Sequence, residues 1–156
     1  MVIKNNTLRI CLAASAGGHL SQLTRLSDSW TGQDTFYVVT KEVVRQELQK
    51  TSRVYVIEEC NRQHPLRVIQ VFYRCLKIIF RERPDVAIST GAAPGFLLCL
   101  AAKMFGARIV WVDSIANIEV LSLSGRLVRS FADLFLTQWL ELANHYNNVE
   151  YVGTIV

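Results

Sequence analysis

The chain has 156 residues, a length that favours one folded domain spanning residues 1–156. Hydrophobic residues make up 51% of the sequence, which is ample for a buried core and excludes an intrinsically disordered chain. The formal net charge of +4 is compatible with an acidic ligand or an anionic membrane surface. No nucleic-acid-binding motif accompanies it, so we expect no nucleic-acid partner.

The first predicted element is a buried strand at residues 8–14, which the chain enters without a signal-peptide pattern. After it, Gly17 and Gly18 stand where the strand turns into a helix. Residues without a Cβ permit a tight turn and the close approach of a ligand, and the free N–H groups of the helix favour an anion. We therefore expect Ser15, Gly17 and Gly18 to bind a phosphate. The alternative is an ordinary turn from strand to helix.

His19 lies in the first turn of this helix, beside any anion that the loop holds. It is a candidate catalytic base, and the alternatives are a contact to phosphate or a structural role. The loop is not a dinucleotide fingerprint, because GxGxxG is absent, and it is not a Walker A loop, because no GK[ST] follows. We expect no cofactor.

Strands and helices alternate along the rest of the chain. Predicted strands lie at residues 35–40, 54–57, 85–89, 107–112, 134–137 and 150–152. Predicted helices lie at residues 41–50, with Val43, Val44 and Leu48 facing inward, and at residues 66–83, 96–105, 126–132 and 139–145. This order predicts an α/β fold: a Rossmann-like, doubly wound, mainly parallel sheet with helices on both faces. Such sheets bind ligands beyond the carboxyl ends of the strands, where the strand order reverses.

The longest predicted helix, at residues 66–83, carries one polar stripe. Its members, three and four residues apart, are Arg67, Gln70, Arg74, Lys77 and Arg81. One interpretation is a helix packed on the sheet with a solvated basic face. The other is that Arg67, Arg74, Lys77 and Arg81 contact anionic lipid headgroups.

A second loop of small residues follows the strand at 85–89 and repeats the order of strand, glycine turn and helix. Thr90, Gly91 and Gly95 are therefore further candidates for phosphate binding. Asp113 ends the strand at 107–112 and reaches the same edge of the sheet. It is the second candidate base, and its alternatives are a helix cap or an ion pair with a nearby arginine.

The four cysteines, at positions 11, 60, 75 and 99, lack the spacing of zinc ligands. We expect no metal site and reduced thiols, as in a cytosolic protein. No uninterrupted apolar stretch reaches the roughly 18 residues of a transmembrane helix, so any membrane contact would be peripheral.

The second half of the chain carries a distinctive pattern: VWVDS at 110–114, LSLSGRL at 121–127, ADLF at 132–135, QW at 138–139 and YVG at 151–153. Together with GGH and PDVAISTGAAPG, it resembles the Alg14 family, the membrane-anchor subunits of the two-chain N-acetylglucosaminyltransferase of asparagine-linked glycosylation. No membrane helix precedes the first strand, so the chain is most similar to bacterial PssD-type members, which are found with exopolysaccharide and capsule synthesis. The glycine loops are also similar to those of MurG, the lipid-linked muropeptide glycosyltransferase.

The resemblance implies the acceptor-side, N-terminal half of a GT-B glycosyltransferase, inactive alone, with the UDP-sugar held by a separate PssE-like subunit. The acceptor would be a lipid-diphosphate-linked sugar, and the protein would lie on the cytoplasmic, inner face of the cell membrane. Gly17, Gly18 and His19 match the family's Gly-Gly-His motif, and Gly91 matches its second loop. The family's acidic residue after the fifth strand is Glu in eukaryotes and Asp113 here.

Two alternatives to a catalytic subunit are a scaffold that only recruits and stabilises the partner, and a free-standing nucleotide-sugar enzyme. The latter is disfavoured, because one α/β domain cannot form a two-domain cleft and no acidic residue follows the first loop at the position of a ribose ligand. The apolar segment GTIV at residues 153–156 is a candidate contact with the partner.

Overall fold

The computed structural model describes residues 7–155 and contains seven strands joined into one sheet. The strands are β1 (Arg9–Ala13), β2 (Asp34–Val39), β3 (Arg53–Val56), β4 (Val86–Ser89), β5 (Arg108–Val112), β6 (Leu134–Thr137) and β7 (Glu150–Tyr151). The helices are α1 (Gly18–Arg25), the 3-10 helix η1 (Ser27–Trp30), α2 (Glu42–Leu48), α3 (Pro65–Glu82), α4 (Ala92–Met104), α5 (Leu123–Val128) and α6 (Leu140–His145).

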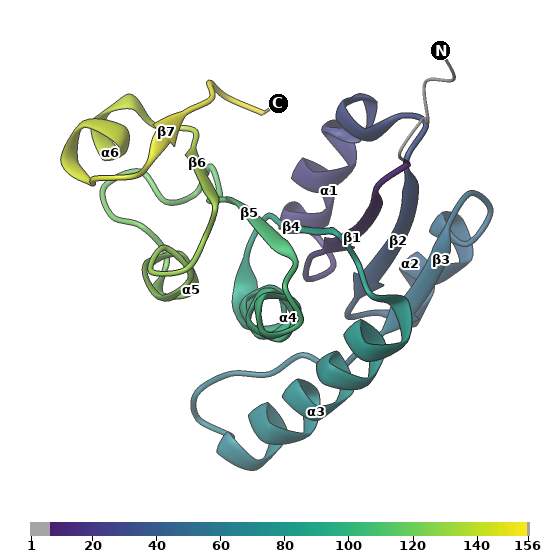
Figure 1. Cartoon of the computed structure of the whole chain (residues 1–156). Coiled ribbons are helices and arrows are strands. Elements are labelled where there is room, and N and C mark those ends of the chain that lie inside the picture. Colours follow the sequence, from purple (N-terminus) through teal and green to yellow (C-terminus); the bar gives the residue numbers. More distant parts are fainter. Residues whose placement is uncertain (1–6, 156) are drawn as a thin grey trace.

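All neighbouring strands pair in parallel, in the order β3-β2-β1-β4-β5-β6-β7 (Figure 1). The chain first builds the sheet outward from β1 to β3, then crosses back through α3 and continues from β4 in the opposite direction. The strand order therefore reverses between β1 and β4, which pair directly, with Ala13 opposite Ser89. The predicted Rossmann-like, doubly wound fold is confirmed.

Side chains alternate along each strand between two hydrophobic clusters, as the pleat of a strand requires. Cys11 and Ala13 face the cluster built with α3, α4 and α5, whereas Leu12 and Ala14 face the cluster built with α1 and η1. Right-handed crossovers explain why the helices lie on two faces of the sheet. After β3 the strands are added in the opposite direction, so the helices that follow β3 cover the other face.

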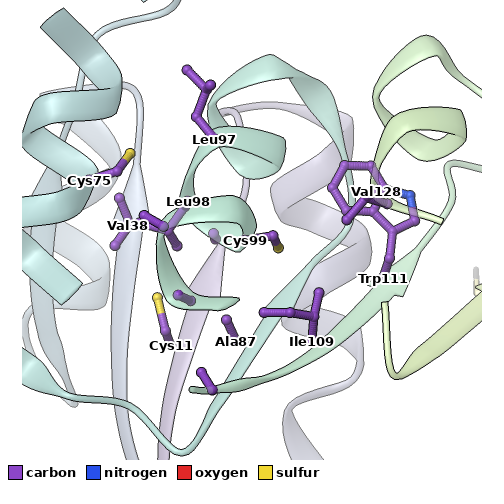
Figure 2. Packing of buried hydrophobic residues seen from close by; sticks show 14 of the residues in the cluster. Cys11, Val38, Cys75, Ala87, Leu97, Leu98, Cys99, Ile109, Trp111 and Val128 are labelled. Carbon is purple, nitrogen blue, oxygen red and sulfur yellow. The ribbon is translucent and has the colours of Figure 1, made fainter. Parts of the chain in front are cut away.

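Helix α4 is the most deeply packed helix, and Figure 2 shows its residues Leu98 and Cys99 above the strands that carry Cys11, Ala87 and Ile109. Small residues let this helix approach the sheet closely. Gly95 is the clearest case, because a Cβ there would collide with the Ser89 hydroxyl.

Three of the sequence-based expectations are wrong in detail. Helix α4 begins at Ala92 rather than at residue 96, so Gly95 belongs to its first turn and not to a loop. Val43 is 70% exposed, since α2 covers the sheet edge with Val44 and Leu48 only. Helix α5 begins at Leu123, three residues before the predicted start, because Ser122 accepts a hydrogen bond from the Gly125 N–H and caps it.

Helix α3 has clear ends. Pro65 occupies its first turn, where a missing N–H costs nothing, and Arg83 ends it in the left-handed conformation (φ 49°) just before Pro84. Among residues 7–155, no helix has the combined length and hydrophobicity needed to cross a membrane.

Candidate functional site

The two glycine loops meet at the switch point of the sheet. The first loop follows β1 and leads into α1, and the second follows β4 and leads into α4, while α1 and α4 lie on opposite faces (Figure 1). Both helix N-termini therefore point toward the carboxyl edge between β1 and β4. This arrangement confirms the predicted convergence and is where doubly wound sheets bind their ligands.

His19 joins the two loops. Its Nδ1 lies 2.9 Å from the carbonyl oxygen of Thr90, and the Thr90 hydroxyl donates to the carbonyl oxygen of His19. A carbonyl oxygen can only accept, so the neutral imidazole must donate from Nδ1 and carry its lone pair on Nε2. The geometry therefore leaves a basic nitrogen on a ring that is held in a fixed orientation.

Gly91 lies directly against the His19 ring. A Cβ at Gly91 would be 2.6 Å from both Cε1 and Nδ1 of His19, and the residue has a φ of 136°. The next residue, Ala92, is also in the left-handed region, with a φ of 68°. The strain lies at Ala92, because a non-glycine residue in this region costs roughly 1–3 kcal/mol, and such strain concentrates at functional sites.

Free backbone donors remain at the start of α1. Within the described part of the chain, the N–H groups of Gly17, Gly18 and His19 make no hydrogen bond, and both glycines are exposed. Gly17 has a φ of 105°, a conformation that favours glycine. These three N–H groups can hold an anion at the positive end of the helix dipole.

Three other residues predicted to bind phosphate are occupied by the protein itself. The Ser15 hydroxyl donates to Glu59 (3.1 Å), the fully buried Thr90 donates to His19, and Gly95 packs on Ser89. These contacts brace the two loops from within, and the Gly91 N–H, at a further predicted phosphate contact, donates to Ser89 Oγ (3.2 Å). Of the predicted phosphate contacts, the backbone of residues 17–19 keeps donors that make no hydrogen bond within the described residues.

Asp113 is buried, with 1% of its surface exposed, and accepts four hydrogen bonds. Its donors are Trp111 Nε1 (3.0 Å), Asn117 Nδ2 (3.0 Å), Ser122 Oγ (2.8 Å) and Ser122 N (3.2 Å). Gly125 is required beside it, because a Cβ there would be 2.6 Å from Asp113 Oδ1. A carboxylate that is filled in this way is not available to a substrate, so the structure does not support Asp113 as the base. Its hydrogen bonds hold the segment between β5 and α5 in place, and they position Ser122, the residue that caps α5.

A second buried polar group lies at the same edge and was not predicted. Gln138 Nε2 donates to Gln22 Oε1 (2.6 Å), and Gln138 Oε1 accepts from the backbone N–H of Ile155 (2.7 Å). Trp139 donates to the carbonyl oxygen of Ile115 (2.8 Å). The QW pair at 138–139 thus connects α1, the segment after β5 and the C-terminal residues. The sequence signal was the QW motif itself, which reveals no partner 116 residues away.

The outward side of α3 is divided into two sectors. At 3.6 residues per turn, its exposed apolar residues fall beside its cations. The apolar sector consists of Leu66, Ile69, Tyr73 and Phe80, each between 58% and 76% exposed. The basic sector consists of Arg67, Arg74, Lys77 and Arg81, all exposed as both interpretations of the stripe require. Arg74 pairs with Glu58 at 2.7 Å, and Lys77 lies over the Tyr73 ring. We call the two sectors together the α3 surface.

The thiols are not candidates for chemistry. All four cysteines are free and buried, and burial raises the pKa of Cys75 to about 12. Thiols with such a raised pKa stay protonated and unreactive.

No three His, Cys, Asp or Glu side chains within residues 7–155 are arranged to hold a metal ion. A cavity of about 750 Å³, lined in part by Lys50, Arg53 and Arg81, lies beside the edge strand β3 and away from the glycine loops.

Residues 27–155 match the family model described as "Oligosaccharide biosynthesis protein Alg14 like". The UDP-N-acetylglucosamine transferase subunit ALG14 of Mus musculus is 27% identical over 187 aligned residues, covering 99% of this chain and 86% of the mouse protein. The Schizosaccharomyces pombe subunit is 31% identical over 120 residues, covering 72% of this chain and 57% of its own.

Solved structures share the fold at low identity. MurG of Acinetobacter baumannii superposes with a TM-score of 0.78 at 12% identity, covering 96% of this chain but 46% of that one. The UDP complex of Staphylococcus aureus MnaA superposes with a TM-score of 0.73 at 16% identity and covers the same shares. The chain thus spans about half the length of these structures. The family match extends over most of the sequence, and the chain therefore belongs to the Alg14 family.

Proposed function

We propose that this protein is one subunit of a UDP-sugar-dependent glycosyltransferase and that it binds a lipid-diphosphate-linked sugar acceptor. The relatives named above are UDP-N-acetylglucosamine transferase subunits, and the chain corresponds to about half of MurG. A PssE-like subunit would supply the other half, with the UDP-sugar, and the pair would form the active-site cleft between the two subunits. The observation that carries the proposal is the His19–Thr90 contact between two glycine loops at the switch point.

The chemistry assigns a separate task to each group. The N–H groups of Gly17, Gly18 and His19 hold the diphosphate of the acceptor. His19 Nε2 takes the proton of the acceptor hydroxyl as its oxygen forms a bond to the anomeric carbon of the donor sugar. The bond from that carbon to UDP breaks, and UDP leaves on the partner subunit. General-base catalysis of this kind contributes typically about 10²- to 10⁴-fold.

The α3 surface is the proposed membrane contact. Its apolar sector would enter the interface between headgroups and acyl chains, while Arg67, Arg74, Lys77 and Arg81 would face anionic headgroups. The protein would then lie peripherally on the cytoplasmic face of the cell membrane, as expected for exopolysaccharide or capsule synthesis on a lipid carrier. The alternative of a solvated basic face predicts no such contact.

The test of the catalytic role is His19→Ala in the copurified pair, with transfer to a lipid-diphosphate acceptor as the readout. We expect transfer to fall at least about 100-fold while the two subunits still copurify. His64→Ala is the matched control, because that histidine is exposed and, among the described residues, its ring forms a hydrogen bond with Asn61 alone. Unchanged transfer in His19→Ala would instead favour the scaffold function, in which this chain only recruits and stabilises the partner.

The test of the membrane role reverses the four cations of the α3 surface to glutamate and measures sedimentation with anionic vesicles. Each cation near an anionic surface contributes about 1 kcal/mol, so binding should fall well over 10-fold. A control with the same change of charge reverses four exposed cations elsewhere: Lys41, Arg45, Lys50 and Arg126. Equal loss in both variants would show that only net charge matters and would reject the α3 surface.

A further inference from the structure

We propose that Glu59 binds a hydroxyl group of the acceptor sugar. The inference rests on the proposed function and assigns a second ligand class to the same site: His19 and the backbone of Gly17 and Gly18 for the diphosphate, and a carboxylate for the sugar. Nothing in the spacing of the sequence singled out this residue, which lies in the polar segment between β3 and α3.

The carboxylate of Glu59 is held by hydroxyls from two strand ends. Its Oε2 accepts from Ser15 Oγ (3.1 Å), just after β1, and its Oε1 accepts from Thr40 Oγ1 (2.5 Å), just after β2. Thr40 Oγ1 in turn accepts from the backbone N–H of Ala16 (2.9 Å). Glu59 therefore lies on the β2 side of the first glycine loop, while His19 and Thr90 lie on its β4 side.

Glu59 is both exposed and oriented, which is an unusual combination. Fixing a free glutamate side chain costs up to about 2 kcal/mol of conformational entropy, so the contacts to the two hydroxyls must offset this cost. Ser15 beneath it is 6% exposed, whereas Glu59 itself is open to solvent. An ionised carboxylate accepts about four hydrogen bonds, and the contacts to Ser15 and Thr40 use two of them. The remaining lone pairs are available at the rim.

The charge of Glu59 determines which ligand group it can bind. A phosphate placed beside Ser15 would meet a like charge, so the diphosphate is confined to the side of the loop where α1 begins. Sugar hydroxyls are neutral donors, and a carboxylate is an acceptor without a proton to donate. Hydrogen bonds to charged groups are also the stronger kind. In a sugar joined to a diphosphate, the diphosphate can lie at the start of α1 while a sugar hydroxyl reaches Glu59 on the other side of the loop.

The neighbouring residue provides a matched control. Glu58 carries the same side chain and is also exposed, but it pairs with Arg74 on α3 at 2.7 Å instead of contacting the glycine loop. Glu59→Gln retains a side-chain oxygen that accepts from Thr40 and an amide that can donate to Ser15. The hydrogen bonds to the loop are therefore kept while the negative charge is lost. Glu58→Gln removes one charge from the same segment without touching the loop.

The experiment measures the binding of two kinds of probe to the full chain by NMR titration. The sugar-free probe is farnesyl diphosphate, and the sugar-bearing probe is farnesyl diphosphate that carries glucose or N-acetylglucosamine. We expect the sugar to strengthen binding to the wild-type protein. Glu59→Gln should bind the sugar-free probe as tightly as the wild type, or more tightly, and should lose about 10-fold affinity for a sugar-bearing probe. In the copurified pair the same variant should raise the KM for the acceptor and leave kcat nearly unchanged.

The outcomes separate the two proposals. If the wild type binds neither probe, the proposed acceptor site itself fails, and this inference fails with it. If the wild type binds both probes and Glu59→Gln keeps the full gain from the sugar, or Glu58→Gln loses as much, only the role of Glu59 is rejected. A fall in kcat at constant KM would also reject sugar binding, because Glu59 would then act in the chemical step.

Discussion

Replacing Gly91 with alanine tests whether the orientation of His19 is what the second glycine loop provides. The added Cβ would be 2.6 Å from the His19 ring at a backbone φ of 136°. The imidazole would therefore have to move, and its hydrogen bond from Nδ1 to the Thr90 carbonyl oxygen would be lost. The variant changes no group that is proposed to contact the acceptor.

Two costs add up in this variant. Placing an L-residue in a left-handed conformation costs about 1–3 kcal/mol, and a lost hydrogen bond costs about 0.5–1.5 kcal/mol. We expect the free energy of unfolding to fall by about 2–4 kcal/mol, which lowers the Tm by roughly 5–15 °C in a domain of this size. Sugar transfer by the copurified pair at a temperature where the variant is folded should fall about 10²-fold or more, as for His19→Ala.

Gly106→Ala is the control for strain alone. Gly106 has a φ of 86°, and a Cβ there would meet no atom within 4 Å. It should lose stability of a similar kind and retain transfer. The double variant His19→Ala/Gly91→Ala completes the cycle, because without the ring the alanine at 91 should add only the backbone cost. Transfer by Gly91→Ala at the level of Gly106→Ala would refute the reasoning, as would strictly additive effects in the cycle.

Three further predictions concern residues whose contacts brace the strands and helices. Asp113→Asn places an amide, which donates as well as accepts, among four hydrogen-bond donors. We expect the free energy of unfolding to fall by about 2–4 kcal/mol. Loss of sugar transfer at unchanged stability would show that the aspartate acts in catalysis instead. A hydrogen bond from the backbone N–H of Ile109 lowers the pKa of Asp133, so its stabilisation is complete above the unfolded-state pKa near 4 and is lost as the pH falls through the folded-state pKa. Asp133→Asn should accordingly cost about 1 kcal/mol at pH 7 and almost nothing at pH 2, measured by urea unfolding at both values. Gly95→Ala should destabilise the fold by about 1–3 kcal/mol through its collision with Ser89, and Ser89→Ala in the same chain should restore part of the loss; an additive double variant would contradict this contact.

The order of elements and the position of the glycine loops were predictable from the sequence because both depend on local patterns. Alternation along Cys11 to Ala14 reports which side chains share a face of the sheet, and Pro84 and Gly106 mark where helices end. The carboxyl ends of parallel strands share one edge, so the convergence of the loop at Gly17 with the loop at Gly91 followed without knowledge of any contact.

The partners across the sheet were decided by the tertiary structure. His19 and Thr90 are 71 residues apart, Ser15 and Glu59 are 44 apart, and Gln22 and Gln138 are 116 apart. No local pattern contains this information, because these pairs form only when the crossovers bring separate loops to one edge. The roles of Asp113 and Gly95 were missed for another reason: their partners lie two to nine residues away, and the loops that bring them together leave no periodic signal in the sequence. Hydrophobic periodicity places a residue on an element, whereas the choice between binding a ligand and bracing a loop depends on donors and close contacts that only the folded chain brings together.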